Sequence, residues 1–206
     1  DETVKLWDLE AKKEVAELAR HPLQVPALAF SPDGKFLATG SGHTSKGDPA
    51  GTLRVFEVET GKERTEAEWV GKPATSVAFS PDGKLLVTTA LGANTLRVYD
   101  FASGKLVKQM QNANSIRLAA FSPDGKLLAT AHGPGSAYGD GSIQVWDTAT
   151  WAERAGLTGH TKLVLGMGFA PDGRHLATAS NDGTVKVWDL QATPSNPTGL
   201  MARNQP

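Results

Sequence analysis

The sequence predicts an all-β protein built from repeated units of four short antiparallel strands. One eleven-residue stretch, written "FSPDGKLLATA" from Phe121, recurs with few changes from Phe30, Phe79 and Phe169, at spacings of 49, 42 and 48 residues. An alternating segment that ends in an aromatic residue and an acid follows each copy, as in "TVKVWD". Self-similarity at this period indicates a repeat architecture, and alternation with period two indicates strands.

Each copy of the stretch is expected to form two strands joined by a tight turn. Apolar or small residues precede the turn, as in "VPALAF" and "IRLAAF", and β-capable runs such as "KLLAT" follow it. Pro-Asp-Gly favours a turn because proline presets φ, aspartate caps the local backbone and glycine accepts a positive φ.

The alternating segment supplies a third strand, and a short turn leads from it to a fourth. Residues 59–62 and 102–105 have the composition of such hairpin turns. An incomplete fifth copy of the third strand begins at Thr3. The aromatic residues expected near the ends of the third strands are Trp7, Phe56, Tyr99, Trp146 and Trp188.

A four-stranded sheet of this size cannot bury both of its faces alone. Stacking the units around an axis buries the faces between neighbours, which predicts a β-propeller of four-stranded antiparallel blades. The expected parts are a half blade over 1–20, full blades over 21–70, 71–112 and 113–158, a last blade over 159–190 without its fourth strand, and a flexible tail over 191–206.

These parts amount to about four blades, so the predicted ring is incomplete. Open blade edges are expected to pair with other chains, because unpaired strand edges invite association. Two explanations are open: the chain is the C-terminal part of a longer propeller, or two copies associate. The first is favoured because the chain begins inside a repeat.

The units resemble the WD-repeat β-propeller family, whose repeats carry a Gly-His pair, a turn of the Pro-Asp-Gly type and a terminal Trp-Asp. The last unit, "LTGHTKLVLGMGFAPDGRHLATASNDGTVKVWDL", contains every element, and the resemblance extends over residues 1–190. It implies a propeller whose relatives mostly serve as scaffolds in larger assemblies.

His160, Ser180 and Asp182 in the last unit look like the parts of a hydrolase triad. The resemblance implies a different role, in which these residues and Trp188 form a buried hydrogen-bond network that stabilises one blade. A buried indole N–H needs a partner, and an isolated buried carboxylate is costly, which favours the same interpretation. We therefore expect no catalytic residues. The network is expected to be complete only in this unit.

Composition excludes several classes of function. The net charge is −1 and no basic stripe is present, which argues against nucleic-acid binding. The sequence contains no run of 18 apolar residues, so it predicts no membrane span. His43, His132 and His175 lack metal-ligand spacing and are expected in surface or turn positions, so neither a metal nor a cofactor is expected. The absence of cysteine is compatible with a cytoplasmic location but does not fix the compartment.

The connection between the second and third strands varies in length. It is compact at "SNDGT" and "LGANT" but extended over residues 41–51 and 131–141, which would lie at one end of the propeller. Binding residues concentrate in loops on rigid scaffolds, although surface loops also tolerate neutral insertions. The candidate partner-binding residues are His43, Lys46, Asp48, His132, Tyr138 and Asp140, with Tyr138 as the anchor.

The favoured function is a non-catalytic scaffold that binds a protein or peptide partner. Two alternatives remain: a sensor or docking domain fused to an upstream catalytic domain, or an enzyme or cofactor-bearing propeller. Arg54, Arg97 and Lys186 are weaker binding candidates, because their positions within third strands favour packing of their stems against a neighbouring blade.

Overall fold

A computed structural model describes residues 2–21, 23–41, 52–65, 67, 69, 74, 76–90, 94–111, 115–133 and 141–191. These residues form sixteen strands and no helix. The strands of the first half of the chain are β1 (Thr3–Asp8), β2 (Lys13–Arg20), β3 (Ala27–Phe30), β4 (Phe36–Gly40), β5 (Leu53–Glu57), β6 (Ser76–Phe79), β7 (Leu85–Ala90) and β8 (Thr95–Asp100). Those of the second half are β9 (Leu106–Gln111), β10 (Ile116–Phe121), β11 (Leu127–His132), β12 (Ile143–Asp147), β13 (Glu153–Leu157), β14 (Val164–Phe169), β15 (His175–Ser180) and β16 (Val185–Asp189).

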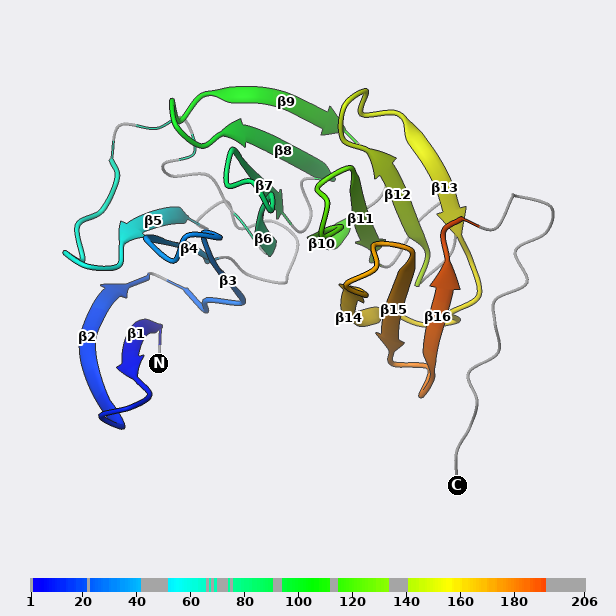
Figure 1. Cartoon of the computed structure of the whole chain (residues 1–206). Helices are drawn as coiled ribbons and strands as arrows, with labels where there is room; N and C mark the ends of the chain where they lie inside the picture. Colours follow the sequence, from blue (N-terminus) through cyan, green and yellow to red (C-terminus); the bar gives the residue numbers. More distant parts are fainter. Residues whose placement is uncertain are drawn as a thin grey trace. The chain divides into compact units, whose positions relative to one another are not determined.

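The strands form five antiparallel sheets in chain order (Figure 1): β1–β2, β3–β5, β6–β9, β10–β13 and β14–β16. Each of the five predicted aromatic residues is the penultimate residue of a third strand. The prediction of an all-β fold of four-stranded propeller blades is therefore confirmed. The fourth strand of the β3–β5 sheet is reduced, over the part that is described, to the bridge between Phe56 and Glu63. The described ranges contain no helix capable of crossing a bilayer.

The Pro-Asp-Gly turns have the predicted left-handed glycine, with φ of 71° at Gly34. The serine before the proline completes the turn, because Ser31 Oγ donates to Asp33 Oδ1 at 2.6 Å and accepts from the Phe36 amide at 2.9 Å. Ser80 and Ser122 repeat both bonds in the next two copies. These hydrogen bonds keep the turn between the first and second strands short and rigid in the β3–β5, β6–β9 and β10–β13 sheets.

The chain forms two compact units, Asp1–Met110 and Gln111–Pro206. The four sheets that contain a second and a third strand each have an aliphatic face and an aromatic face. The aliphatic face carries small or branched residues such as Ala38, which pairs with Val55 across β4 and β5. The aromatic face carries a leucine of the second strand opposite the aromatic residue of the third, such as Leu86 and Tyr99.

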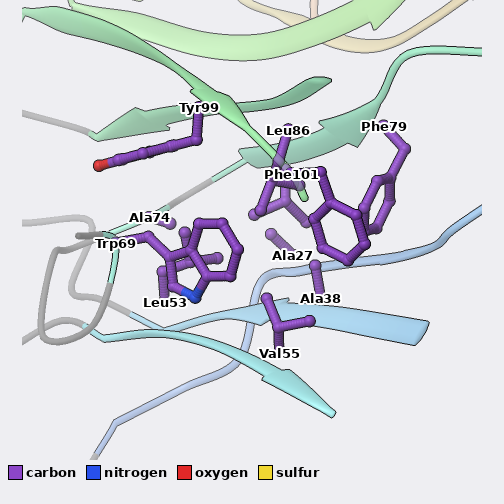
Figure 2. Packing of buried hydrophobic residues seen from close by; sticks show 11 residues of the cluster. Ala27, Ala38, Leu53, Val55, Trp69, Ala74, Phe79, Leu86, Tyr99 and Phe101 are labelled. Carbon is purple, nitrogen blue, oxygen red and sulfur yellow. The ribbon is translucent and has the colours of Figure 1, made fainter. Parts of the chain in front are cut away.

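Within each unit, the aliphatic face of one sheet packs on the aromatic face of the next sheet along the chain. In the first unit, Ala38 and Val55 of the β3–β5 sheet share a cluster with Leu86 and Tyr99 of the β6–β9 sheet, shown in Figure 2. The β1–β2 sheet packs on the β3–β5 sheet in the same way. In the second unit the members from the two sheets are Ala129, Ala131 and Ile143 on one side and Leu176 and Trp188 on the other.

Arg64 fastens the end of one blade to the next blade within the first unit. Its guanidinium lies 4.9 Å from the Phe101 ring centroid and 5.4 Å from that of Trp69. It also donates to the carbonyls of Phe101 and Ala102 at 2.9 and 3.1 Å. The Trp69 and Phe101 rings are themselves stacked at 5.8 Å (Figure 2). Cation–π and hydrogen bonds thus hold the chain after β5 against the turn after β8.

Candidate functional site

The last sheet holds a buried chain of polar side chains around Thr178 in the middle of β15. Trp188 of β16 donates its indole N–H to Thr178 Oγ1 at 2.9 Å. His160, which precedes β14, places Nε2 2.9 Å from the same oxygen and Nδ1 2.8 Å from Asp182 Oδ2. Asp182 lies in the short turn between β15 and β16, which brings its carboxylate back over the histidine.

One assignment of protons gives every group in this hydrogen-bond network a partner. The Thr178 hydroxyl accepts from Trp188 and donates to His160 Nε2, which leaves Nδ1 protonated to donate to Asp182. A buried network in which each group has a partner rigidifies the structure around it. The His160 side chain has no exposed surface, and that of Asp182 is 8% exposed, so the ring is held away from solvent.

The Asp182 carboxylate is held in its charged form. Burial opposes ionisation, but hydrogen bonds from the Thr184 hydroxyl, His160 and the Thr161 and Thr184 amides outweigh it and keep the pKa of Asp182 well below its usual value. A carboxylate that accepts this many hydrogen bonds is stabilised as the anion. It therefore acts as a fixed acceptor that orients the imidazole.

Ser180 lies outside the chain of side chains from Trp188 to Asp182. Its hydroxyl donates to the Lys162 carbonyl at 2.9 Å and accepts from the Asp182 amide at 3.1 Å. The hydroxyl that contacts His160 Nε2 belongs instead to Thr178, which sequence analysis did not single out. The signal was present, because Thr39, Thr88 and Thr130 occupy the same place in the other copies.

Two other sheets of the described part keep portions of this arrangement. His21, nine residues before Phe30 as His160 is before Phe169, places Nε2 2.9 Å from Thr39 Oγ1 and Nδ1 3.1 Å from Thr52 Oγ1. In the β10–β13 sheet, Trp146 donates to Thr130 Oγ1 at 2.9 Å. The threonine is thus the common element, and only the last sheet combines it with histidine, aspartate and tryptophan among the residues described.

The residues that flank each long connection are joined to each other by backbone hydrogen bonds. Ser41 and Thr52 exchange both backbone bonds, at 2.8 and 3.1 Å, and the His132 amide donates to the Ser142 carbonyl at 3.0 Å. Gly141, at φ 79°, closes the second connection where a Cβ would lie 2.2 Å from the Lys162 carbonyl oxygen. The candidate residues His43, Lys46, Asp48, Tyr138 and Asp140 lie outside the described residues.

His132 is buried, so the expectation that it occupies a surface or turn position is wrong. It is the last residue of β11, fully buried, and neither ring nitrogen has a hydrogen-bond partner among the described residues. Burial lowers its pKa to about 4, against a smaller opposing effect of the Gln144 side chain. In the repeat its position matches that of Ser180.

The described residues bring together no metal-binding set. Across the described ranges, no group of three or more histidine and carboxylate side chains could hold a metal ion. His175 instead places Nδ1 2.7 Å from Asp172 Oδ2, where it completes the last Pro-Asp-Gly turn in place of the missing serine.

Comparison with known proteins supports the architecture. A family model described as "WD domain, G-beta repeat" matches residues 12–46 and 151–189, and one described as "Eukaryotic translation initiation factor eIF2A" matches residues 46–148. "Apoptotic protease-activating factor 1" of Danio rerio is 30% identical over 187 residues, which is 90% of this chain and 14% of that protein. The chain belongs to the WD-repeat family.

Other relatives of this WD-repeat chain match shorter parts of it. "Target of rapamycin complex subunit wat1" of Schizosaccharomyces pombe is 35% identical over 102 residues, or 48% of the chain and 30% of the relative. "Anaphase-promoting complex subunit cdh1" of Dictyostelium discoideum is 26% identical over 109 residues, or 53% and 14%. The chain therefore spans less than a third of the length of these relatives. WD-repeat proteins typically serve as non-catalytic protein-interaction scaffolds.

Proposed function

We propose that this WD-repeat chain is a non-catalytic scaffold that binds a protein or peptide partner at the end bearing the two long connections, residues 41–51 and 131–141. The observation that carries the proposal is the contrast between the two ends of the sheets. The Pro-Asp-Gly ends repeat one short, internally hydrogen-bonded turn, whereas the opposite connections differ in length. Variable loops on a uniform frame are where binding specificity concentrates.

The residues that flank the two connections support a binding role because their backbones are fixed by close contacts. The Ser41–Thr52 pair closes one connection, and the close approach of Gly141 to Lys162 closes the other against the neighbouring turn. A loop anchored in this way keeps its ends fixed, which lowers the entropy lost when a partner binds. The proposed contact residues are His43, Lys46, Asp48, Tyr138 and Asp140, with Tyr138 as the aromatic anchor.

The polar network of the last sheet supports a structural rather than a catalytic role. His160 has both ring nitrogens engaged, by Thr178 and Asp182, and the Ser180 hydroxyl is directed to a backbone carbonyl. A nucleophile must lie within hydrogen-bond reach of its base, and Ser180 is engaged elsewhere. We therefore assign these residues to blade stability, with Thr178 as the bridging hydroxyl.

The test replaces both long connections with the compact "SNDGT" sequence of the last unit and measures capture of partners from a lysate of the source cells. Loss of capture with an unchanged circular dichroism spectrum and melting temperature is the expected result. A matched control replaces Lys35 and Lys126, which are exposed at the Pro-Asp-Gly end, with alanine and should capture as the parent does. Unchanged capture by the loop variant would place the binding site elsewhere.

A further inference from the structure

The second long connection, residues 131–141, ends against the chain segment that leads into the last blade. This linking segment, residues 160–163, lies between β13 and β14. Gly141 has a φ of 79°, and a Cβ built on it would overlap the Lys162 carbonyl oxygen and lie 2.8 Å from His160 Cβ. Since no side chain fits between the two backbones, the position of Lys162 sets where the connection can end.

The end of β15 and the turn after it hold the carbonyl groups of the linking segment. Ser180 Oγ donates to the Lys162 carbonyl at 2.9 Å, and the Asn181 amide donates to the Leu163 carbonyl at 2.9 Å. The Ser180 hydroxyl also accepts from the Asp182 amide at 3.1 Å, which fixes its orientation. The carbonyl that the second connection meets is therefore held by a side chain of the last blade.

Asp182 holds the first half of the linking segment. Its Oδ2 accepts from the Thr161 amide at 3.0 Å and lies 2.8 Å from His160 Nδ1. Hydrogen bonds to a charged acceptor are about twice as strong as those between neutral groups. Each residue of the linking segment thus has a hydrogen bond to this part of the last sheet, which makes the segment a firm support for Gly141.

The first long connection has a similar contact in the first unit. Gly40 is the last residue of β4, where the connection over 41–51 begins. A Cβ on Gly40 would lie 2.5 Å from the Ala74 carbonyl oxygen and 2.9 Å from Ala74 Cβ, and Ala74 lies just before β6 of the next sheet. Both long connections are thus flanked by a glycine that meets the backbone of the segment leading into the next blade. The repetition in two blades supports a role of this contact in placing the connections.

Ser180 can be altered without breaking the polar network of the last sheet. Its hydroxyl takes no part in the hydrogen bonds around Thr178. Removing it takes one hydrogen bond each from the Lys162 carbonyl and the Asp182 amide and leaves the others in place. A change at the second long connection would then come through the linking segment alone.

We infer that Ser180 is a positioning residue for the second long connection: its hydroxyl fixes the Lys162 carbonyl, and that carbonyl sets where Gly141 and the end of the connection lie. A side chain of one blade thereby determines the placement of a loop in the preceding blade. The effect on placement stands by itself, whereas an effect on partner binding rests on the proposed function.

Hydrogen exchange of the whole chain, followed by NMR, tests the inference. The reporter is the His132 amide, which donates to the Ser142 carbonyl at 3.0 Å and closes the connection. Ser180→Ala should speed its exchange about five- to tenfold, because a lost hydrogen bond favours local opening. The Ser122 amide at the opposite end of the same sheet, which donates to the Leu127 carbonyl, should exchange as in the parent.

Three further variants complete the test. Gly141→Ala should speed exchange of the His132 amide from the other side of the contact, because its Cβ displaces the connection. Ser180→Thr keeps a hydroxyl and should exchange as the parent does. Thr150→Ala, which removes a hydroxyl from the β12–β13 turn, is the matched control and should also match the parent.

Unchanged exchange of the His132 amide in Ser180→Ala would overturn the inference. Equal acceleration at Ser122, which would show a general loss of stability, or a threonine variant as fast as the alanine variant would overturn it too. Capture of partners from source-cell lysate by Ser180→Ala separates the inference from the proposed function. Faster exchange with unchanged capture would uphold the positioning and contradict partner binding at this connection.

Discussion

Replacing Thr178 with valine tests whether one hydroxyl holds the polar network of the last sheet together. Valine preserves the shape and the β-branch but removes the oxygen that accepts from Trp188 and contacts His160, both at 2.9 Å. Both partners are buried, with the indole of Trp188 and the ring of His160 out of reach of water. Two buried polar atoms would therefore lose their partner at once.

The expected cost follows from those two atoms. An unpaired buried donor or acceptor costs about 1–3 kcal/mol, so two of them cost about 2–6 kcal/mol before relaxation. The added methyl group recovers about 1 kcal/mol of apolar burial. We expect a net loss of about 1–5 kcal/mol in the free energy of unfolding of the second unit.

Urea denaturation measures this loss as a lower midpoint at constant slope. Thr88→Val is the matched control, because Thr88 holds the place of Thr178 in β7, where the third strand carries Tyr99, without an indole N–H, in the place of Trp188. It should cost less than about 1 kcal/mol. In a Trp188→Phe background the cost of Thr178→Val should fall, since one of the two orphaned groups is gone. Equal costs for Thr178→Val and Thr88→Val would refute the network as described.

Three further predictions concern single residues. Asp182→Ala should lower stability by about 1–3 kcal/mol in urea denaturation, because it leaves His160 Nδ1 and the Thr184 hydroxyl without their acceptor. His132→Ser should flatten the dependence of stability on pH between about 4 and 6.5, since the folded-state pKa of His132 is lowered to about 4. Leu106→Glu should stabilise the first unit by about 0.5–1 kcal/mol, because it places a carboxylate nine residues after Arg97, as Glu63 is placed after Arg54.

The sign of the His132 prediction follows from proton binding. Between its folded-state pKa of about 4 and its ordinary value of 6.5, the unfolded chain binds more protons at this residue, so stability is full above pH 6.5 and decreases toward pH 4. The shift corresponds to about 3 kcal/mol, which urea titrations of parent and variant at several pH values resolve by difference. A variant with the parent's pH profile would show that the ring titrates normally.

The Leu106→Glu and Asp182→Ala predictions have their own controls. Leu106 is 38% exposed and Arg97 Nη1 has no hydrogen-bond partner among the described residues, so Leu106→Gln separates the effect of charge from that of lost apolar area. A glutamate variant no more stable than the glutamine variant would contradict the ion pair. For Asp182→Ala, unchanged stability would contradict the assigned structural role.

The fold was predictable because the residue types of each repeat indicate its turns and its strand ends. The Pro-Asp-Gly turns lie where the sequence predicts them, with a left-handed glycine such as Gly34. The aromatic-acid pairs mark the ends of the third strands, as at Trp188 and Asp189. These signals depend on a few neighbouring residues, so they are readable without knowing what packs against them.

Thr178 and His132 show what the sequence did not reveal. Thr178 lies in a β-capable run, where threonine is favoured for its branching, and its bond to Trp188 arises only when β15 and β16 pair in register. His132 was expected in a surface or turn position within the long connection 131–141, but β11 extends to this residue and its ring is buried. Roles that depend on strand register or on strand ends require the structure.

The central claim is that the end bearing the long connections contacts the partner, and site-specific photo-crosslinking tests it most directly. A photoreactive amino acid replaces Tyr138 in one variant and Lys126, exposed in the Pro-Asp-Gly turn of the same blade, in another. The Tyr138 variant should crosslink to a protein partner in source-cell lysate, and the Lys126 variant should not. A partner crosslinked from Lys126 and not from Tyr138 would contradict it.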